Sequence, residues 1–291
     1  MYHKKSVLPY ILIAPAVLIL ILYSYLPLPY GIFLSVNRVT PGTGELKFSG
    51  FENYRMLFVD PYFWESLSTT LYYALISTVA MVFIGTIISL ILNSKIKGTS
   101  TYMTIMFIPW VISDVVAGTT WTWLFNPDFG VLNYIFSPFG IKASDILNKP
   151  KYAIYAVVIV SVWKMLSYST LLLLAGLQNV SNDLIEASKL DGCSGFATFR
   201  YITFPIFSPT VLVVTLLNLI NCINQSGIIL VLTDGGPLRS TETLALYLYK
   251  EAFTNFHLTN AASLSIVLAA MNMIIVAIYL YVSKKNRMVI S

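Results

Sequence analysis

Residues 186–205 read EASKLDGCSGFATFRYITFP and form the longest break between apolar stretches that is expected on the cytoplasmic side. Asp183 and Glu186 have the spacing of a capping box, which predicts that a short helix begins here. Gly192 is expected to end this helix, because glycine adopts left-handed backbone at little cost. Residues 196–202 open a second short helix, which ends at the following proline or continues through it. Two short helices joined at a glycine can dock into a groove on a soluble partner.

The composition indicates a membrane protein. Of the 291 residues, 57% are hydrophobic and only 11% are charged, whereas about a quarter of the residues in a soluble domain are charged. The net charge of +5 is small and dispersed, which argues against a nucleic-acid partner. His3 and His257 lie far apart in the sequence, so that neither a metal cluster nor a nucleophile–base pair can be assembled from them.

Six apolar stretches are long enough, at about 20 residues each, to cross a bilayer. They are expected to be helical, because lipid offers the backbone no hydrogen-bond partners. The predicted spans are residues 7–26, 67–92, 102–124, 152–175, 206–230 and 261–282. No small-x-small cleavage site follows the first stretch, which is therefore predicted to be an uncleaved span that continues to about residue 36 as a bent or restarted helix. The sequence thus predicts an all-α integral membrane protein with six transmembrane helices and one domain, 1–291.

The distribution of basic residues predicts the orientation. With the amino terminus inside, nine basic and three acidic residues are cytoplasmic, whereas the longer outside loops hold eight basic and nine acidic residues. The nine are Lys4, Lys5, Lys95, Lys97, Lys189, Arg200, Lys284, Lys285 and Arg287. The opposite orientation would place the densest basic clusters outside. Both termini are therefore expected to be cytoplasmic.

Residues 182–205 resemble the EAA loop of ABC-importer permeases. In that loop Glu-Ala-Ala is followed after three residues by Gly, and after nine more by Ile-x-Leu-Pro. The matching residues are Glu186, Ala187, Gly192, Ile202 and Pro205, while Ser188 replaces the second Ala and Phe204 replaces Leu. Both replacements keep size or apolarity. The alternative is an ordinary cytoplasmic loop, but the resemblance implies contact with an ATPase through Glu186, Ala187, Ser188, Asp191, Gly192, Ile202 and Pro205.

Three outside loops resemble those of the sugar-type permeases. With them, the resemblance runs from about residue 48 to the carboxyl terminus. The first loop is rich in aromatic residues, which suits a short helix at the membrane interface. The matching residues are Phe51, Asn53 and Tyr54 in the first loop, Asn126, Pro127, Gly130 and Asn133 in the second, and Gly235, Gly236, Pro237, Thr243, Tyr249 and Phe253 in the third. Each loop taken singly could be a turn-rich connector, but four such stretches in one order are a stronger signal.

Polar residues inside the predicted spans are costly in lipid and tend to face a cavity or a partner. Asn218, Asn221 and Gln225 share one face of the fifth predicted helix, and Asn224 lies beside them. Carboxamides suit the hydroxyl groups of a sugar; the alternative is hydrogen bonding between helices. Tyr168, in the fourth predicted span, could stack on a sugar ring or simply be packed with its hydroxyl satisfied. The resemblance to maltose-type permeases implies that these residues line the substrate cavity.

Two charges fall in the predicted spans. Lys164 lies near the middle of the fourth span, where a lysine costs about 2.5–3.5 kcal/mol on insertion scales. Asp114 lies near the middle of the third span. Because the two spans are antiparallel, the charges should reach similar depth, and we expect an ion pair between them or between one of them and a partner subunit. The alternative is that each faces water in the translocation path.

Neither a Walker-type glycine loop nor a catalytic set of residues is present. The resemblance therefore implies a permease subunit of an ATP-driven ABC importer for a sugar or related polar solute, in a bacterial cell membrane. It also implies a second, homologous permease subunit, two ATPase subunits that bind ATP and Mg²⁺, and an extracytoplasmic solute-binding protein. The alternative is an ion-coupled secondary transporter, which favours buried carboxylates and inverted repeats. The sequence has one intramembrane acid and no internal repeat.

Overall fold

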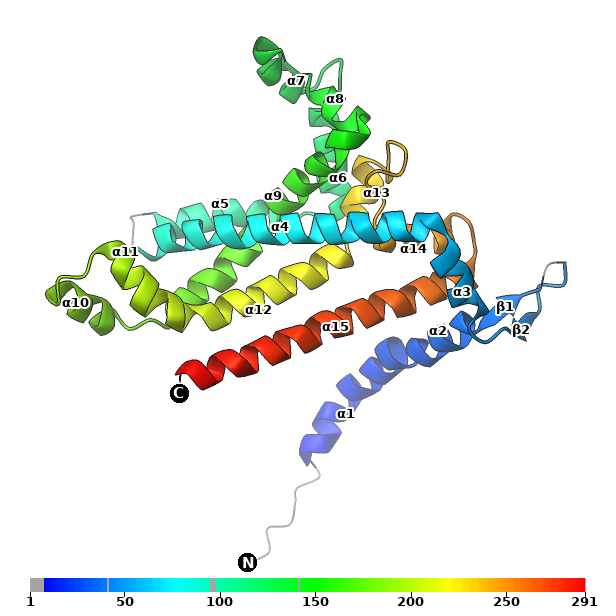
Figure 1. Cartoon of the computed structure of the whole chain (residues 1–291), viewed down its shortest axis with the longest axis horizontal. Coiled ribbons are helices and arrows are strands. Elements are labelled where there is room, and N and C mark those ends of the chain that lie inside the picture. The colour runs from blue at the N-terminus through cyan, green and yellow to red at the C-terminus, as the bar shows by residue number, and fades with distance from the viewer. Residues whose placement is uncertain (1–7, 41, 95–97, 141, 291) are drawn as a thin grey trace, which may run out of the picture. The chain divides into compact units, whose positions relative to one another are not determined.

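The structure is a computed structural model, which describes residues 8–40, 42–94, 98–140 and 142–290 and the side chains within 10–284. The chain divides by its internal contacts into two compact units. The first holds the chain up to Pro61 together with Leu248–Ala269, and the second holds Tyr62–Tyr247 together with the residues from Ala270 onward. Apart from two short strands, the regular elements in the described part of both units are helices (Figure 1).

A bent helical segment opens the first unit. Helix α1 (Leu8–Leu20) passes through a π-helical turn, η1 (Ile21–Tyr25), into α2 (Pro27–Ser35). Pro27 is tolerated at the start of α2, because the first helical N–H has no partner within the helix. The prediction that the first apolar stretch continues as a bent helix is confirmed. The run from Tyr10 to Ser35 has a mean hydropathy of 2.3 and is long enough to cross a membrane.

A β-hairpin and a short helix follow α2. Strand β1 (Asn37–Val39) pairs antiparallel with β2 (Leu46–Phe48), with Arg38 opposite Lys47. Helix α3 covers Glu52–Val59. The short helix predicted in this loop is therefore confirmed, whereas the hairpin was not predicted.

The hairpin forms because its turn and its base are both supported. Gly42 and Gly44 have positive φ angles of 88° and 71°, which other residues adopt only with strain. The Asn53 side chain of α3 is 4% exposed and donates hydrogen bonds of 2.8 Å to the carbonyls of Ser35 and Asn37. It thereby satisfies a carbonyl at the end of α2 and fixes the first strand.

Long apolar helices dominate the rest of the chain. In chain order the elements are α4 (Pro61–Asn93), α5 (Thr99–Val111), α6 (Asp114–Leu124), α7 (Val131–Phe136), η2 (Ser137–Phe139), α8 (Ala143–Asn148), α9 (Pro150–Leu177), α10 (Asn182–Leu190), α11 (Gly195–Thr198), η3 (Phe199–Thr203), α12 (Phe204–Ile223), α13 (Gly227–Leu232), α14 (Leu244–Phe253) and α15 (Leu258–Ile290). The helices predicted over 67–92, 152–175 and 261–282 are confirmed within α4, α9 and α15. In the described residues, five helical runs could cross a membrane, or six if α5 and α6 form one bent span.

The helix predicted over 102–124 is broken, so the expectation of one continuous helix there is wrong. The axes of α5 and α6 differ by 96°. Pro109 removes a backbone donor near the end of α5, and Ile112 is extended. The Ser113 hydroxyl then accepts a hydrogen bond of 3.2 Å from the Val116 N–H and caps α6.

The helix predicted over 206–230 is also interrupted, between α12 and α13. The Asn224 side chain donates to the Ile220 carbonyl at 2.7 Å. The Gln225 side chain accepts from the Gly227 N–H at 3.1 Å. Carboxamides that bind the local backbone in this way compete with helical hydrogen bonds, which explains why α12 ends here.

Helix α9 is the most enclosed of the long helices. In its most apolar stretch 61% of the residues are buried, compared with 33% in that of α4. It contacts α5 and α12 (Figure 1). Leu173 and Leu177 of α9 pack with Phe207 of α12 in a buried cluster. A Cβ at Gly176 would lie 2.4 Å from the Thr210 methyl carbon, so only glycine permits this close approach.

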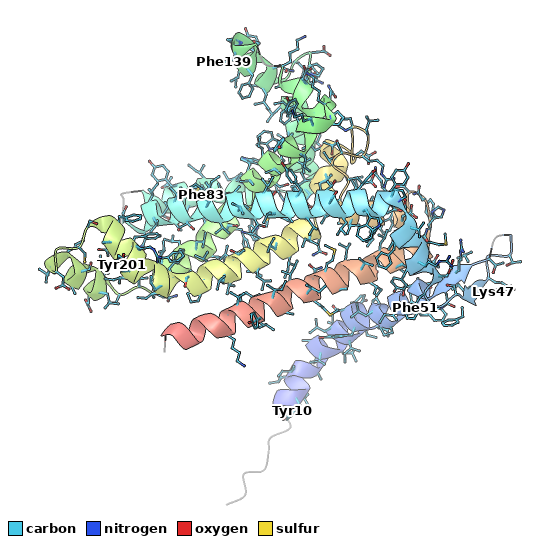
Figure 2. All side chains as sticks on the ribbon, viewed as in Figure 1. Tyr10, Lys47, Phe51, Phe83, Phe139 and Tyr201 are labelled. Atoms are coloured by element: carbon cyan, nitrogen blue, oxygen red, sulfur yellow. The ribbon has the colours of Figure 1, made fainter. Side chains whose placement is uncertain are left out.

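Helix α4 has a face suited to lipid. Leu71, Leu75, Val79 and Phe83 recur at every fourth position and are 51%, 61%, 59% and 66% exposed. Figure 2 shows Phe83 pointing outward from this helix. A stripe of exposed aliphatic and aromatic side chains along a 33-residue helix is typical of a membrane-spanning segment.

Candidate functional site

A cavity of about 420 Å³ lies within the second unit, between α4, α5, α6, α9 and the end of α12. Its lining mixes aromatic, carboxamide, hydroxyl and charged side chains. The lining residues are Tyr73, Met81, Trp110, Asp114, Ser161, Lys164, Met165, Asn218, Asn221, Cys222, Asn224 and Gln225. All four carboxamide residues singled out in the sequence are therefore brought together at one cavity, as are the two charged residues.

Asn218 is the most buried of the carboxamides, at 1% exposure. Its Oδ1 accepts a hydrogen bond of 3.0 Å from the Ser169 hydroxyl of α9. Its Nδ2 is buried and has no hydrogen-bond partner among the described residues. A buried amide donor without a partner is costly, so this Nδ2 is a candidate donor to a polar group bound at the cavity.

Of the other three carboxamides, one lies within α12 as predicted and two lie beyond its end. Asn221 lies one turn beyond Asn218 and donates to the Leu217 carbonyl at 2.9 Å. Asn224 exchanges side-chain contacts of 3.3 Å with Asn272 of α15. Gln225 lies beyond the end of α12, so that it does not continue the predicted helical face, yet it reaches the same cavity.

Tyr168 lies behind the cavity wall. It stacks on Trp110 with ring centroids 5.6 Å apart and an interplanar angle of 5°. Trp110 lines the cavity, whereas Tyr168 is not among its lining residues. The structure therefore assigns to Tyr168 the support of Trp110, and the predicted contact of Tyr168 with substrate would require this stack to open.

The ion pair predicted between the third and fourth spans is present. The Lys164 ammonium donates to Asp114 Oδ1. The lysine side chain is 10% exposed and the aspartate side chain 33% exposed. Pairing offsets the cost of placing either charge at this depth.

The two helix breaks meet at this ion pair. Asp114 occupies the first turn of α6, directly after the break between α5 and α6. Gly227 begins α13, directly after the break that follows α12, and a Cβ added to it would lie 2.7 Å from Asp114 Oδ2. Glycine at 227 is thus required for the close approach. Two interrupted helices beside one polar cavity are an arrangement that transporters use to expose backbone groups to a pathway.

Cavity residues that the sequence analysis missed come from α4, α5, α9 and α12. The Tyr73 hydroxyl donates to Ser161 at 2.8 Å, which joins α4 to α9 at the cavity wall. Met81 and Trp110 complete the apolar part of the lining. Tyr73 and Ser161 are polar residues within predicted spans, and the criterion applied to Asn218 would have found both.

The loop 182–205 consists of two short helical segments, as predicted, but its capping differs. Ser181 caps α10, and its hydroxyl accepts from the Asp183 N–H at 3.2 Å. The capping box predicted between Asp183 and Glu186 is therefore wrong. Gly192 has a φ of 79°, which confirms the left-handed glycine after the first helix. Figure 1 shows α10 and α11 beyond the ends of α9 and α12.

The second segment of this loop continues into α12. Ser194 caps α11, and its hydroxyl accepts from the Ala197 N–H at 3.2 Å. Helix α11, the π-helical η3 and α12 form one helical run, so Pro205 joins the loop to the span and does not end it. Ser188 is 3% exposed, and its hydroxyl lies 3.0 Å from that of Thr198. The serine that departs from the resemblance thus links α10 to α11.

The remaining singled-out residues of the loop are placed as follows. Glu186, Ala187 and Asp191 are exposed, and Ile202 is half-buried. Pro205 lies in the first turn of α12. Three large apolar side chains of the loop are unusually exposed: Leu190 at 90%, Phe196 at 79% and Tyr201 at 76%.

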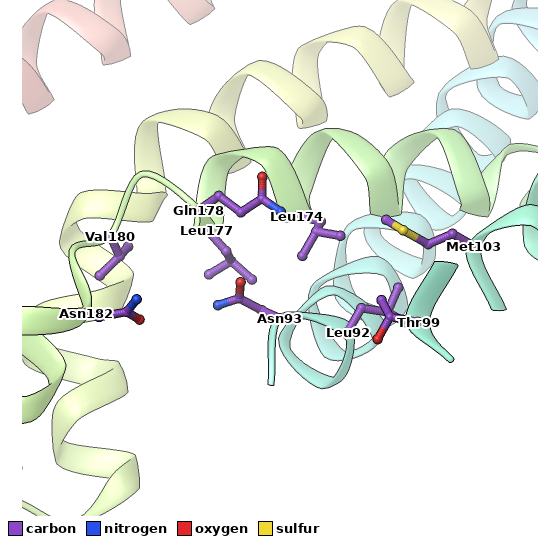
Figure 3. A pocket seen from close by; sticks show the side chains of 9 residues that line it. All are labelled: Leu92, Asn93, Thr99, Met103, Leu174, Leu177, Gln178, Val180 and Asn182. Atoms are coloured by element: carbon purple, nitrogen blue, oxygen red, sulfur yellow. The ribbon is translucent and has the colours of Figure 1, made fainter. Parts of the chain in front are cut away.

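A second cavity, of about 510 Å³, lies beside the start of α10 (Figure 3). It is formed where α4 and α9 end and α5 begins. Asn93, Gln178 and Asn182 place carboxamides at its edge, and Leu174 and Leu177 form its apolar side. None of the described lining residues is ionisable.

The amino-acid sequence matches a known protein family. The family described as binding-protein-dependent transport system inner membrane component matches residues 82–288. This chain belongs to that family. It is a permease subunit of an ABC transporter, and the alternative of an ion-coupled transporter finds no support.

Named relatives of this permease cover almost its whole length. It is 31% identical to the trehalose/maltose transport system permease protein MalF of Thermococcus litoralis, over 98% of this chain and 96% of the relative. It is 30% identical to the sn-glycerol-3-phosphate transport system permease protein UgpA of Rhizobium meliloti, over 91% of both chains.

Solved structures share the fold of this permease. A chain in the crystal structure of a bacterial ABC transporter that imports the acidic polysaccharide alginate matches with a TM-score of 0.83 and 21% identity, over 97% of this chain and 96% of that chain. A chain in a second alginate transporter structure, in complex with an alginate pentasaccharide-bound periplasmic protein, matches with a TM-score of 0.82 and 19% identity, over 97% and 96% of the two chains. At this identity the likeness concerns the fold alone.

Proposed function

We propose that this permease imports a sugar or a related polar solute across a bacterial cell membrane, and that the cavity beside α12 is its share of the solute pathway. The observation that carries the proposal is the convergence of four carboxamides on one cavity. Neutral donors and acceptors suit sugar hydroxyls, and an aromatic wall suits the apolar face of a sugar ring. Relatives named for trehalose and maltose transport support this substrate class.

Within this proposal the chain crosses the membrane six times, with α5 and α6 forming one broken span. The apolar length of the helices and the exposed stripe on α4 support this arrangement. Both termini are cytoplasmic, which the distribution of basic residues supports. Of those residues, Lys4, Lys5, Lys95 and Lys97 lie outside the described residues, as do the side chains of Lys285 and Arg287.

The loop 182–205 is then the contact with a separate ATPase subunit, which binds ATP and Mg²⁺. Its exposed Leu190, Phe196 and Tyr201 are costly in water and suit a protein partner. Glu186 is exposed on α10 and can pair with a basic residue of that partner. Because α11 continues into α12, movement of the loop is passed directly to the helix that carries the carboxamides.

The complete importer further contains a second, homologous permease, a second ATPase subunit and an extracytoplasmic solute-binding protein. The periplasmic protein in the alginate transporter complex supports the last of these. Purification of the tagged chain from its native membrane, followed by mass spectrometry of the co-purifying chains, tests the assembly. We expect a nucleotide-binding chain and a second permease. Recovery of this chain alone, in a form that transports solute, would overturn the proposal.

A further inference from the structure

The ion pair in the cavity is asymmetric. The side chain of Asp114 is 33% exposed, whereas that of Lys164 is 10% exposed. Asp114 Oδ1 is occupied by the ammonium, and Oδ2 has no hydrogen-bond partner among the described residues. A solute in the cavity therefore meets the carboxylate more than the ammonium.

No other lining residue carries a charge at neutral pH in the described part of the chain. The remaining polar groups are carboxamides and hydroxyls, such as those of Asn218 and Ser161. The charge that a solute encounters on this side of the pathway is thus set by Asp114 and Lys164. In a cavity with low-dielectric walls, charged groups act on a solute more strongly than they would in water.

We propose that Asp114 and Lys164 form a charge filter that favours neutral polyhydroxylated solutes and disfavours phosphorylated or acidic ones. This inference rests on the proposed role of the cavity in solute transport. Asp114 Oδ2 accepts hydrogen bonds from solute hydroxyls, and its charge opposes a phosphate or carboxylate. Lys164 donates to Asp114 Oδ1 and holds the carboxylate in place. Specificity then arises both from repulsion of the anionic group and from hydrogen bonds to the hydroxyls.

The geometry fixes the carboxylate in this role. Gly227 leaves room for Oδ2, because a Cβ at this position would lie 2.7 Å away. Ser113 caps α6 and thereby sets the direction in which Asp114 leaves the helix. The position of the carboxylate therefore depends on both helix breaks.

The test uses the membrane complex of permease and ATPase subunits in lipid nanodiscs and two matched pairs of probes: maltose with maltose 1-phosphate, and trehalose with trehalose 6-phosphate. Affinity is measured by titration calorimetry without the solute-binding protein, so that only the membrane complex discriminates. We expect the wild type to prefer the neutral probe. Asp114→Asn leaves the ammonium uncompensated and should shift the ratio of affinities by about tenfold or more towards the phosphorylated probe. Asp114→Glu keeps the carboxylate and should retain the preference.

Assembly of each variant is checked by co-purification of the ATPase subunits. If Asp114→Asn does not assemble, the double change Asp114→Asn with Lys164→Met removes both charges and should abolish the preference. An unchanged ratio in a variant that still binds the neutral probe overturns the filter and leaves the proposed function standing. Failure of the wild type and every variant to bind any probe would instead contradict the proposed role of the cavity, and the filter with it.

Discussion

Asn218 combines burial, an anchored acceptor and a donor without a protein partner. In Asn218→Ala the cavity loses that donor, and a solute hydroxyl loses its hydrogen bond. We expect solute affinity to fall by about tenfold, which corresponds to about 1.4 kcal/mol. The measurement is uptake by the reconstituted importer over a range of solute concentrations.

Thr215→Val is the matched control for this prediction. Thr215 lies on the same helix, and its hydroxyl binds the Val211 carbonyl of its own backbone at 2.8 Å. It is not among the residues that line the cavity. Equal losses in Asn218→Ala and Thr215→Val would show that the effect is structural and not a loss of solute contact.

The ion pair predicts a non-additive mutant cycle. Asp114→Asn alone leaves Lys164 buried without its partner, and breaking a buried pair costs about 3 kcal/mol. Lys164→Met alone should cost less, because Asp114 is the more exposed partner. The double change should assemble better than Asp114→Asn alone. The yield of assembled complex, measured by size-exclusion chromatography, checks this order, and equal yields for the single and double changes would contradict the pairing.

At the scale of the elements, α10 and α11 form the contact that we propose for the ATPase subunit. Glu186→Lys reverses the charge of an exposed side chain on α10. We expect membrane insertion to be unchanged and ATP-dependent uptake to be lost, because the contact with the ATPase is repelled. Asp183→Asn, in the exposed first turn of the same helix, should cost about 0.3–1 kcal/mol of helix stability and leave uptake intact. Normal uptake by the Glu186→Lys variant would contradict a contact between α10 and the ATPase.

The contact between α9 and α12 predicts a stability effect. Gly176→Ala would place a Cβ 2.4 Å from the Thr210 methyl carbon and force the helices apart. We expect a destabilisation of about 1–3 kcal/mol, as for overpacking in a tight core. Gly31→Ala in α2 is the control, since a Cβ there meets no atom within 4 Å. Thermal unfolding of the two purified variants tests the difference, and equal midpoints would show that the contact can relax.

The elements also show what sequence reasoning could and could not supply. Long apolar stretches predict helices well, because length and hydropathy leave few alternatives in lipid. The helix breaks within 102–124 and 206–230 were not predicted, because a hydropathy pattern does not reveal a single helix cap such as Ser113. Asn224 and Gln225 were predicted to contact solute or to bond between helices, but their hydrogen bonds to the local backbone, which end α12, were missed.

The cavity was predictable in part. Asp114, Lys164 and the carboxamides were found because polar groups in apolar helices are rare. Trp110 was missed because an aromatic residue in a span is ordinary, and only the tertiary structure places it on the cavity wall. Tyr168 was predicted either to contact a sugar or to be packed, and in the structure it stacks on Trp110 outside the cavity lining.

At the scale of the whole molecule, the chain is one subunit of a transporter complex. It belongs to the binding-protein-dependent permeases, and the described residues contain no group of histidine, cysteine or carboxylate side chains that could hold a metal ion. The loop 182–205 and the cavity lie at different ends of the helical run that contains α12. This separation suits a protein in which one subunit hydrolyses ATP and another conducts the solute.

The most direct test of this account is sugar uptake by proteoliposomes that contain the purified importer, measured with and without ATP on the side of the ATPase subunits. The account predicts uptake only when ATP, the ATPase subunits and the solute-binding protein are all present. Uptake by this chain in the absence of nucleotide would contradict it.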